Sequence, residues 1–307
     1  MLPDSLVQPL LPGPVDIVGD VHGEIEPLHA LLRRLGYDEQ GRHPENRRLV
    51  FVGDLTDRGP DSPAVVDLVQ QLLDDGRAQC VLGNHDFNLL MGQTKADNGW
   101  FFGRPFCDAT GYVSPQVQAD EPTRQRTLAL FRRLPVALER SDLRVVHSCW
   151  SDAMITIARQ ANDVVALYKL HQERIEADLA DSELDDVGKR LRRQNENPVK
   201  RITSGPEERR SPPPVDPTVT RAERRVYWWN DYQDAFCVFG HYALPYGEPR
   251  GNRRTHCIDY GVAKRWTERR DGRTSDFSTR LAALRYPERV VVFDEADRED
   301  LVLASPG

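Results

Sequence analysis

The sequence predicts a layered α/β domain, and two observations carry that prediction. Short, nearly continuous apolar runs recur along the chain, as is typical of strands that are covered on both faces. Amphipathic helical patterns separate the first three runs, and strands that alternate with helices favour parallel pairing. The predicted strands are Val15–Asp20, Arg48–Asp54, Gln79–His85, Leu143–Ser148, Ala235–His241, Thr255–Gly261 and Arg289–Glu295.

Two helices are predicted between the first three strands. In Glu26–Gly36, leucines recur at the i, i+3, i+4, i+7 spacing of a buried helix face, and Gly36 provides a stop. The second helix is expected to begin at Ser62, which can cap it, with Pro63 at the first helical position. Gly76 ends this helix.

A long section between the fourth and fifth strands has a different pattern. Its first part is charged and helical, and Gly205–Arg225 reads as a proline-rich loop before the strands resume at Ala235. We therefore expect a single domain over residues 1–307, with a helical and proline-rich insertion at about 151–234 that acts as a cap.

Composition narrows the class of protein. The chain is 39% hydrophobic and 29% charged, which allows a large core and argues against a disordered chain. A formal net charge of -7 disfavours non-specific binding to nucleic acid, although a local basic groove remains compatible with it. The five cysteines form no CxxC pair, which is typical of a reducing compartment. Neither a signal peptide nor a membrane span is evident, so we expect a cytoplasmic protein with no membrane partner.

Polar side chains follow the apolar runs at the points where the predicted strands end. Such groups are costly to bury unless they have hydrogen-bond partners, a metal or a catalytic role. In layered α/β folds, functional sites gather at the carboxyl ends of the strands. The sequence therefore predicts one site formed by Asp20, His22, Asp54, Asn84, His85, His147 and His241.

The chemistry of these side chains indicates a metal centre. Imidazole together with carboxylate and amide oxygen suits Mn, Fe or Zn, and the lack of thiolates argues against a structural zinc site. Asp54 is a candidate bridge between two ions, with Asp20 and His22 on one of them. The second ion would take one amide and two imidazole ligands, from Asn84, His147 and His241. Two ions roughly 3.5–4 Å apart are the usual arrangement for in-line displacement at phosphorus.

Three ordered motifs carry a resemblance to a known family. The elements GDxHG, GDxxDRG and GNHD, with the later His and GH elements, resemble the calcineurin-type metallophosphoesterases over Asp16 to Gly261. Within them the chain is most similar to the bacterial branch around diadenosine tetraphosphatases and Ser/Thr phosphoprotein phosphatases. The resemblance implies two packed mixed β-sheets flanked by helices, with a dinuclear site at one edge.

The resemblance also implies roles for individual residues. His85 matches the family's proton donor to the leaving group, Asp57 matches its orienting partner, and Arg58 matches a phosphate clamp. The implied cofactor is a pair of divalent ions, with Mn2+ expected first and Fe, Zn, Co or Ni as alternatives. The positions that match the family's metal ligands are Asp20, His22, Asp54, Asn84, His147 and His241.

The substrate is the open question. Leu82 stands where phosphoprotein phosphatases of the eukaryotic type usually carry an arginine, which favours a nucleoside polyphosphate such as diadenosine tetraphosphate. A Ser/Thr phosphoprotein phosphatase is the alternative, and a nucleic-acid end phosphatase is the third. Asp57 departs from symmetrical diadenosine tetraphosphatases, which usually lack that carboxylate.

Three further features have competing interpretations. Lys200 and Arg201 lie in a locally basic stretch and are candidate substrate contacts, against the alternative of a solvated helix face. The aromatic clusters Asn98–Gly103 and Val226–Tyr232 could stack on a nucleobase, but we expect them to pack a cap onto the core. Cys149 is expected to be a small buried hydrophobic residue and not a nucleophile.

Overall fold

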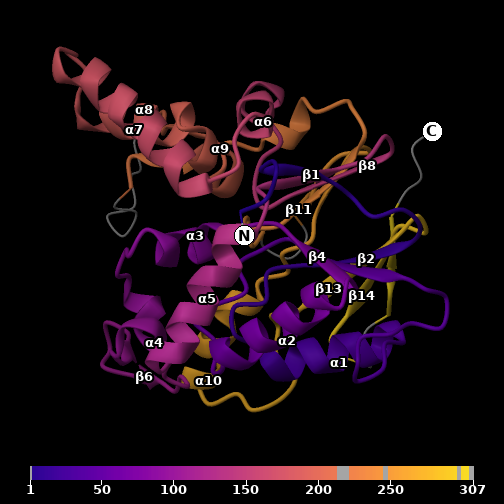
Figure 1. The fold of residues 1–307 in the computed structure, drawn as a ribbon. Coiled ribbons are helices and arrows are strands. Elements are labelled where there is room, and N and C mark those ends of the chain that lie inside the picture. The colour runs from indigo at the N-terminus through magenta and orange to yellow at the C-terminus, as the bar shows by residue number, and fades with distance from the viewer. Residues whose placement is uncertain (1, 213–220, 245–247, 296–298, 304–307) are drawn as a thin grey trace.

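Two mixed β-sheets pack face to face in the computed structural model, which describes residues 2–212, 221–244, 248–295 and 299–303 (Figure 1). The six-stranded sheet has the order β15 (Leu301–Val302), β14 (Val290–Phe293), β13 (Ala282–Tyr286), β2 (Val15–Val18), β3 (Arg48–Phe51) and β4 (Ala78–Cys80). The five-stranded sheet has the order β1 (Val7–Pro9), β7 (Ala137–Glu139), β8 (Leu143–Val146), β11 (Phe236–Phe239) and β12 (Thr255–Cys257). The predicted pair of packed mixed sheets is therefore confirmed.

Each sheet contains a run of parallel strands, and these runs set the position of the site. In the first sheet β2, β3 and β4 pair in parallel, with Val18 opposite Phe51 and Phe51 opposite Cys80. In the second sheet β8, β11 and β12 are parallel. Parallel strands deliver their carboxyl ends to one edge of a sheet, so the loops after these strands emerge together.

Helices cover the outer faces of the sheets. The longer helices are α1 (Ile25–Leu35), α2 (Ser62–Asp74), α3 (Asn84–Leu90), α5 (Glu121–Arg133), α6 (Asp152–Arg159), α7 (Val164–Ala180), α8 (Asp186–Glu196) and α9 (Pro198–Ser204). The short ones are α4 (Gly99–Phe102), α10 (Arg265–Arg270) and the 3-10 turns η1 (Ala96–Asn98), η2 (Trp228–Asn230) and η3 (Val262–Lys264). In Figure 1, α1 and α2 lie beside the six-stranded sheet, and α7, α8 and α9 group together on the opposite side of the molecule. None of the helices in the described part of the chain is long and apolar enough to cross a membrane.

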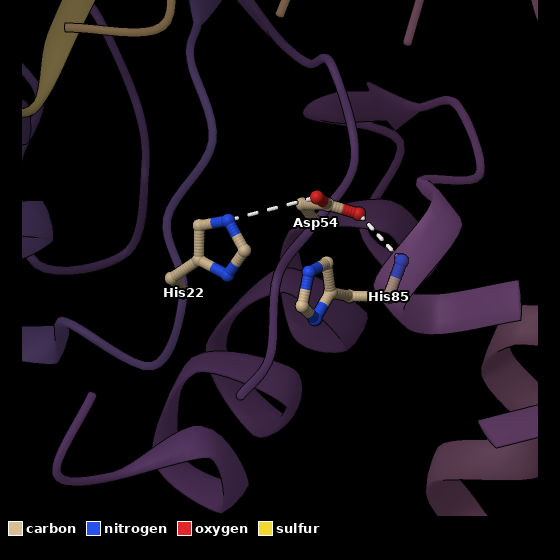
Figure 2. A group of neighbouring side chains, drawn as sticks. All are labelled: His22, Asp54 and His85. Carbon is tan, nitrogen blue, oxygen red and sulfur yellow. Dashed lines mark hydrogen bonds and ion pairs between the residues drawn. The ribbon is translucent and has the colours of Figure 1, made fainter. Parts of the chain in front are cut away.

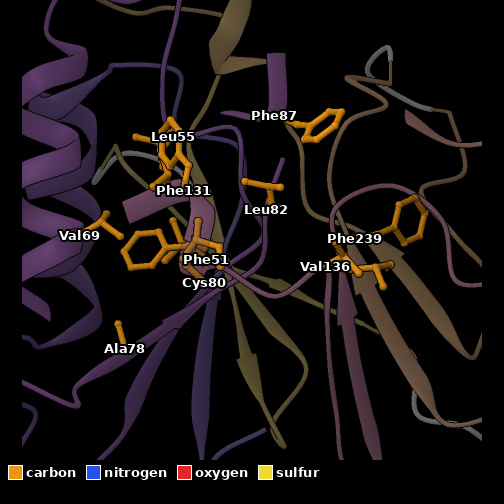
Figure 3. Packing of buried hydrophobic residues seen from close by; sticks show 14 of the residues in the cluster. Phe51, Leu55, Val69, Ala78, Cys80, Leu82, Phe87, Phe131, Val136 and Phe239 are labelled. Carbon is orange, nitrogen blue, oxygen red and sulfur yellow. The ribbon is translucent and has the colours of Figure 1, made fainter. Parts of the chain in front are cut away.

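Successive side chains of each strand point to opposite faces of the sheet, and this alternation builds two apolar layers. Ile17 and Val50 point into the space between the sheets, where they meet Val145 and Val238 of the second sheet. The neighbouring side chains on the same strands point toward the helices. Figure 3 shows this second layer, in which Phe51, Val69 of α2 and Phe131 of α5 are among the labelled residues. The two layers hold the six-stranded sheet from both faces.

Several local predictions need correction. Asp61, and not Ser62, caps α2, because its carboxylate accepts a 2.9 Å hydrogen bond from the Ala64 N–H. The third predicted strand, Gln79–His85, ends at Cys80, and Asn84 begins α3 instead of ending a strand.

The predicted proline-rich loop Gly205–Arg225 is also only part loop. Its two ends form an antiparallel hairpin of β9 (Glu207–Arg209) and β10 (Glu223–Arg225), and residues 213–220 between them lie outside the described residues. A second small hairpin pairs β5 (Phe106–Cys107) with β6 (Val113–Ser114).

Candidate metal centre

The loops after β2 and β3 bring two carboxylates and an imidazole together. The backbone N–H of His22 donates to the carbonyl of Asp54 over 2.9 Å, which ties the two loops side by side. From the second sheet, β8 leads to His147 and β11 to His241, and the Gly240 N–H donates to the His147 carbonyl over 2.8 Å. All six predicted metal ligands therefore lie at one edge of the two sheets, where α3 contributes Asn84.

The backbone at this edge takes up unusual conformations. Five site residues other than glycine have positive φ, a region that costs L-residues energy and that clusters at functional sites: His22, Asp54, Asp57, Arg58 and His241, with φ of 49°, 49°, 76°, 67° and 70°. Position 240 requires glycine for a different reason, because a Cβ there would overlap the Asp20 carboxylate. The loops are therefore shaped to aim their side chains at a common point.

Two imidazoles face Asp54 through the same ring nitrogen, Nε2. His22 Nδ1 donates to the Thr56 carbonyl over 3.0 Å and His147 Nδ1 donates to the Val52 carbonyl over 2.8 Å. In a neutral imidazole held this way, Nε2 carries a lone pair. Those two Nε2 atoms lie 3.6 Å and 3.3 Å from the same atom, Asp54 Oδ2. Figure 2 shows the first of these contacts, between His22 and Asp54. Lone pairs that face a carboxylate oxygen on both sides call for cations between them, as at a bridging ligand.

The remaining ligands complete the same pattern. Asn84 Oδ1 lies 3.1 Å from His147 Nε2 and 2.7 Å from His241 Nδ1. The carboxylate of Asp20 accepts the His241 N–H at 3.0 Å and lies 4.0 Å from His22 Nε2. This set of oxygen and imidazole donors fits Mn, Fe or Zn.

The protonation of two of the three candidate histidine ligands matches a role in metal binding. Burial, with Arg58 nearby, lowers the pKa of His22 well below its usual value, and burial with Arg225 does the same to His241. Both rings are therefore neutral, as metal binding requires. Burial also lowers the pKa of His147, but Asp54 and Asp20 outweigh it and raise that pKa to about 10. A bound cation would take the place of the His147 proton.

A second group of side chains borders the metal ligands. His85 Nδ1 lies 2.7 Å from Asp57 Oδ2, and Arg58 Nη2 lies 3.0 Å from His85 Nε2. The His85 N–H also donates to Asp54 Oδ1 over 2.8 Å (Figure 2). Burial lowers the pKa of His85, but Asp54 and Asp57 outweigh it and raise the pKa above the usual value. The raised pKa favours the imidazolium, which is the form that can donate a proton. The three predicted catalytic residues are thus in mutual contact.

Three residues of the site were not identified from the sequence. Trp100 Nε1 donates to Asp57 Oδ1 over 2.7 Å, and Asp97 Oδ2 accepts from Arg58 Nε over 2.8 Å. Asp86 accepts from the Leu55 N–H at 3.1 Å, and burial with Asp54 raises its pKa to about 7. The position of Asp86 at the first turn of a helix after Gly83 was a usable signal, since an acid there can cap.

The candidate substrate contacts lie on α9, which packs on the loop after His147. The N–H groups of Ser148 and Cys149 both donate to the Ile202 carbonyl over 3.1 Å. Arg201 Nη1 donates to Asn195 Oδ1 over 3.1 Å. Lys200 is half-buried and forms no ion pair within the described ranges, and burial, with Lys95 nearby, lowers its pKa.

The other residues singled out in the sequence are mostly structural. Trp100 and Trp229 are fully buried, in agreement with packing by both aromatic clusters. Cys149 is also buried, and burial raises its pKa to about 12, so the thiol is unsuited to act as a nucleophile.

Together, the packed mixed sheets, the converging ligands and the His85–Asp57 pair define a metal-dependent hydrolase. Residues 13–264 match the family model described as calcineurin-like phosphoesterase. The chain belongs to the calcineurin-like phosphoesterase family, whose members use a dinuclear metal centre, and it is a metal-dependent phosphoesterase.

Relatives resemble the chain over nearly all its length. It is 28% identical to the asymmetrical bis(5′-nucleosyl)-tetraphosphatase PrpE of Oceanobacillus iheyensis, over 91% of this chain and 90% of that protein. It is 30% identical to the protein of the same name from Anoxybacillus flavithermus, over 90% of this chain and 92% of that protein. Among solved structures, the cold-active protein-tyrosine phosphatase of a Shewanella species aligns with a TM-score of 0.54 at 18% identity, over 98% of this chain and 83% of that one. That likeness supports the fold alone.

Proposed function

We propose that this chain hydrolyses nucleoside polyphosphates, with diadenosine tetraphosphate as the preferred substrate and a pair of Mn2+ ions as the cofactor. The proposed substrate rests on the similarity to two asymmetrical bis(5′-nucleosyl)-tetraphosphatases along about nine-tenths of the chain. The residues of the site support the class of reaction. All five cysteines are free, which supports a reducing, cytoplasmic location.

We propose the same division of the metal ligands between two ions that the sequence predicts. We propose Asp20 and His22 for one ion and Asp54 as the bridge, because Asp54 Oδ2 lies between two imidazoles. The other ion would be held by Asn84, His147 and His241. When bound, such a pair lowers the pKa of a water molecule and neutralises charge on the phosphate.

His85 is proposed as the proton donor to the leaving oxygen. Asp57 accepts from Nδ1 and so leaves Nε2 as the ring atom that faces the site. Arg58 Nη2 reaches the same point, 3.0 Å from Nε2, so a phosphate oxygen placed there could accept from the guanidinium and the imidazolium together. Asp97 holds the other side of the guanidinium and fixes its direction.

Lys200 and Arg201 remain proposals as contacts for the substrate. Lys200 is the better supported, because its half-buried ammonium forms no ion pair among the described residues, and burial lowers its pKa more than the charge of Glu207 raises it. A bound anion would relieve that cost. Arg201 already donates to Asn195.

The test is a side-by-side assay of the Mn-loaded protein. Diadenosine tetraphosphate, a phosphothreonine peptide and a 3′-phosphorylated oligonucleotide would be compared by kcat/KM, with the products separated by chromatography. We expect the dinucleotide to be preferred by at least tenfold. AMP and ATP as products would indicate asymmetric cleavage, and two ADP would indicate symmetric cleavage. A preference for the phosphopeptide would overturn the proposal in favour of a phosphoprotein phosphatase.

A further inference from the structure

A groove lies beside the metal centre, between the hairpin β9–β10, the turn η2 and the segment after His241. Its volume is about 840 Å3. We name it the cap groove, and Arg225, Tyr227, Asn230, Tyr242 and Leu244 line its part nearest the metal ligands and η2. Its remaining lining is charged with both signs, because Arg210, Arg221 and Arg224 stand among Glu207, Glu208, Glu223 and Asp231. Tyr242 connects the groove to the metal ligands, because its ring lies 5.4 Å from the His241 ring and 6.3 Å from the Tyr227 ring.

The wall of the groove is fastened to the metal centre at two points. Arg225 Nη1 donates to the carbonyl of His241 over 3.0 Å, and Trp228 Nε1 donates to the carbonyl of Ser148 over 2.8 Å. His241 is a candidate ligand, and Ser148 directly follows another. The segment from Arg225 to Trp228 therefore has a fixed position relative to the site of reaction.

Tyr227 presents an aromatic surface to this groove. It is 40% exposed, unlike its neighbour Trp229, which is 1% exposed. One face of the Tyr227 ring stacks on Trp229 at 4.6 Å and 16°, and its hydroxyl donates to Glu248 over 3.1 Å. The ring is thus held in one plane with surface left open to solvent, which is what a stacking platform for a base requires.

Arg225 supplies a positive charge next to that ring, and its guanidinium lies 5.5 Å from the centre of the Tyr242 ring. The arginines around it are paired, Arg221 with Glu207 at 3.1 Å and Arg224 with Glu208 at 2.6 Å. Arg225 is exposed and forms no ion pair with any carboxylate among the residues that the structure describes. A guanidinium in this position suits a phosphate oxygen.

We propose that the cap groove binds the second nucleoside of a dinucleoside polyphosphate, the one joined through the phosphates that lie beyond the metal pair. Tyr227 stacks on the base, and Arg225 contacts the intervening phosphates. The phosphates between the two nucleosides would extend from His241 past Tyr242 to Tyr227. This inference rests on the proposed function. It also makes Tyr227 the exception in an aromatic cluster whose tryptophans serve packing.

The experiment compares Tyr227→Ala and Arg225→Ala with their conservative counterparts, Tyr227→Phe and Arg225→Lys. Each variant is assayed with diadenosine tetraphosphate and with p-nitrophenyl phosphate, which is too small to reach the groove. Because stacking on an aromatic side chain is worth about 1–3 kcal/mol per base, Tyr227→Ala should lower the ratio of the two kcat/KM values by about tenfold, mainly through KM. Tyr227→Phe should keep most of the ratio, and Arg225→Lys should retain more of it than Arg225→Ala.

A second readout separates this inference from the proposed function. Diadenosine tetraphosphate is tested as a competitive inhibitor of p-nitrophenyl phosphate hydrolysis. If the wild type is inhibited but does not cleave the dinucleotide, the proposed function fails, and a weaker inhibition of Tyr227→Ala would still support the groove. An equal loss of activity on both substrates, or an unchanged ratio and an unchanged inhibition constant, would overturn the groove.

Discussion

The indole of Trp100 and the carboxylate of Asp57 form a 2.7 Å hydrogen bond inside the protein, with Trp100 Nε1 as donor and Asp57 Oδ1 as acceptor. Both residues are fully buried. The other oxygen of Asp57 contacts His85 at 2.7 Å. Trp100 therefore acts as a positioning residue for the proposed proton donor, in addition to filling the core.

Replacing Trp100 with Phe tests this relationship. The change keeps an aromatic ring but leaves Asp57 Oδ1 without its donor, so we expect the free energy of unfolding in urea to fall by about 1–3 kcal/mol. We also expect kcat for an alkyl phosphate to fall more than kcat for p-nitrophenyl phosphate. The matched control is Phe101→Leu, in the same helix, which should lower stability without altering that contrast. Equal loss of kcat on both substrates would contradict the positioning role.

Removal of the imidazole should separate binding of metal from turnover. In His85→Ala the backbone N–H that donates to Asp54 remains, so we expect the Mn content to stay the same. General acid catalysis typically contributes about 10²–10⁴-fold, and this loss should be largest for alkyl phosphates, whose leaving groups need a proton most. Metal analysis and kcat on a series of leaving groups would measure both. The proton-donor role would be rejected by equal losses across that series.

The sequence indicates those site residues that belong to short motifs, and it does not indicate those that reach the site through contacts distant in the chain. The Asp, Asn and His residues that the sequence places after its predicted strands could be proposed as ligands because motif spacing is local. Trp100 and Asp97 act on residues about 40 positions earlier, and nothing in their own neighbourhood marks that contact. The cap of α2 was misplaced by one residue because Asp61 and Ser62 are both good caps, and only the backbone decides between them.

Loss of a metal ligand should remove metal and activity together. We expect Mn2+ to raise the melting temperature of the wild type, because a ligand at about 100 times its Kd stabilises by about 2.7 kcal/mol. In Asp20→Asn and His147→Ala this shift should disappear, along with the Mn measured by elemental analysis. A control outside the site, His171→Gln on α7, should keep the full shift. A normal Mn shift in Asp20→Asn would remove Asp20 from the ligand set.

The pH dependence of stability should depend on His256 in β12. This side chain is buried, and burial, with Arg250 nearby, lowers its pKa to about 3 from a usual value of 6.5. In the folded protein the ring is neutral, whereas in the unfolded chain it binds a proton below pH 6.5. The unfolded state thus gains protons as the pH falls, so stability is present above pH 6.5 and is lost toward pH 3.

Between pH 7.5 and pH 5.5, His256 alone should lower the free energy of unfolding by about 1.4 kcal/mol, which is the equivalent of one pKa unit. Urea unfolding of the wild type and of His256→Gln at the two pH values measures this contribution. Other groups titrate equally in both proteins, so they cancel in the difference between the two pH responses. The glutamine variant should lose less stability on acidification than the wild type, even if it is less stable at pH 7.5. Parallel losses in the two proteins would show that folding does not lower the pKa of His256, even though its Nε2 lies 3.3 Å from the Tyr260 hydroxyl.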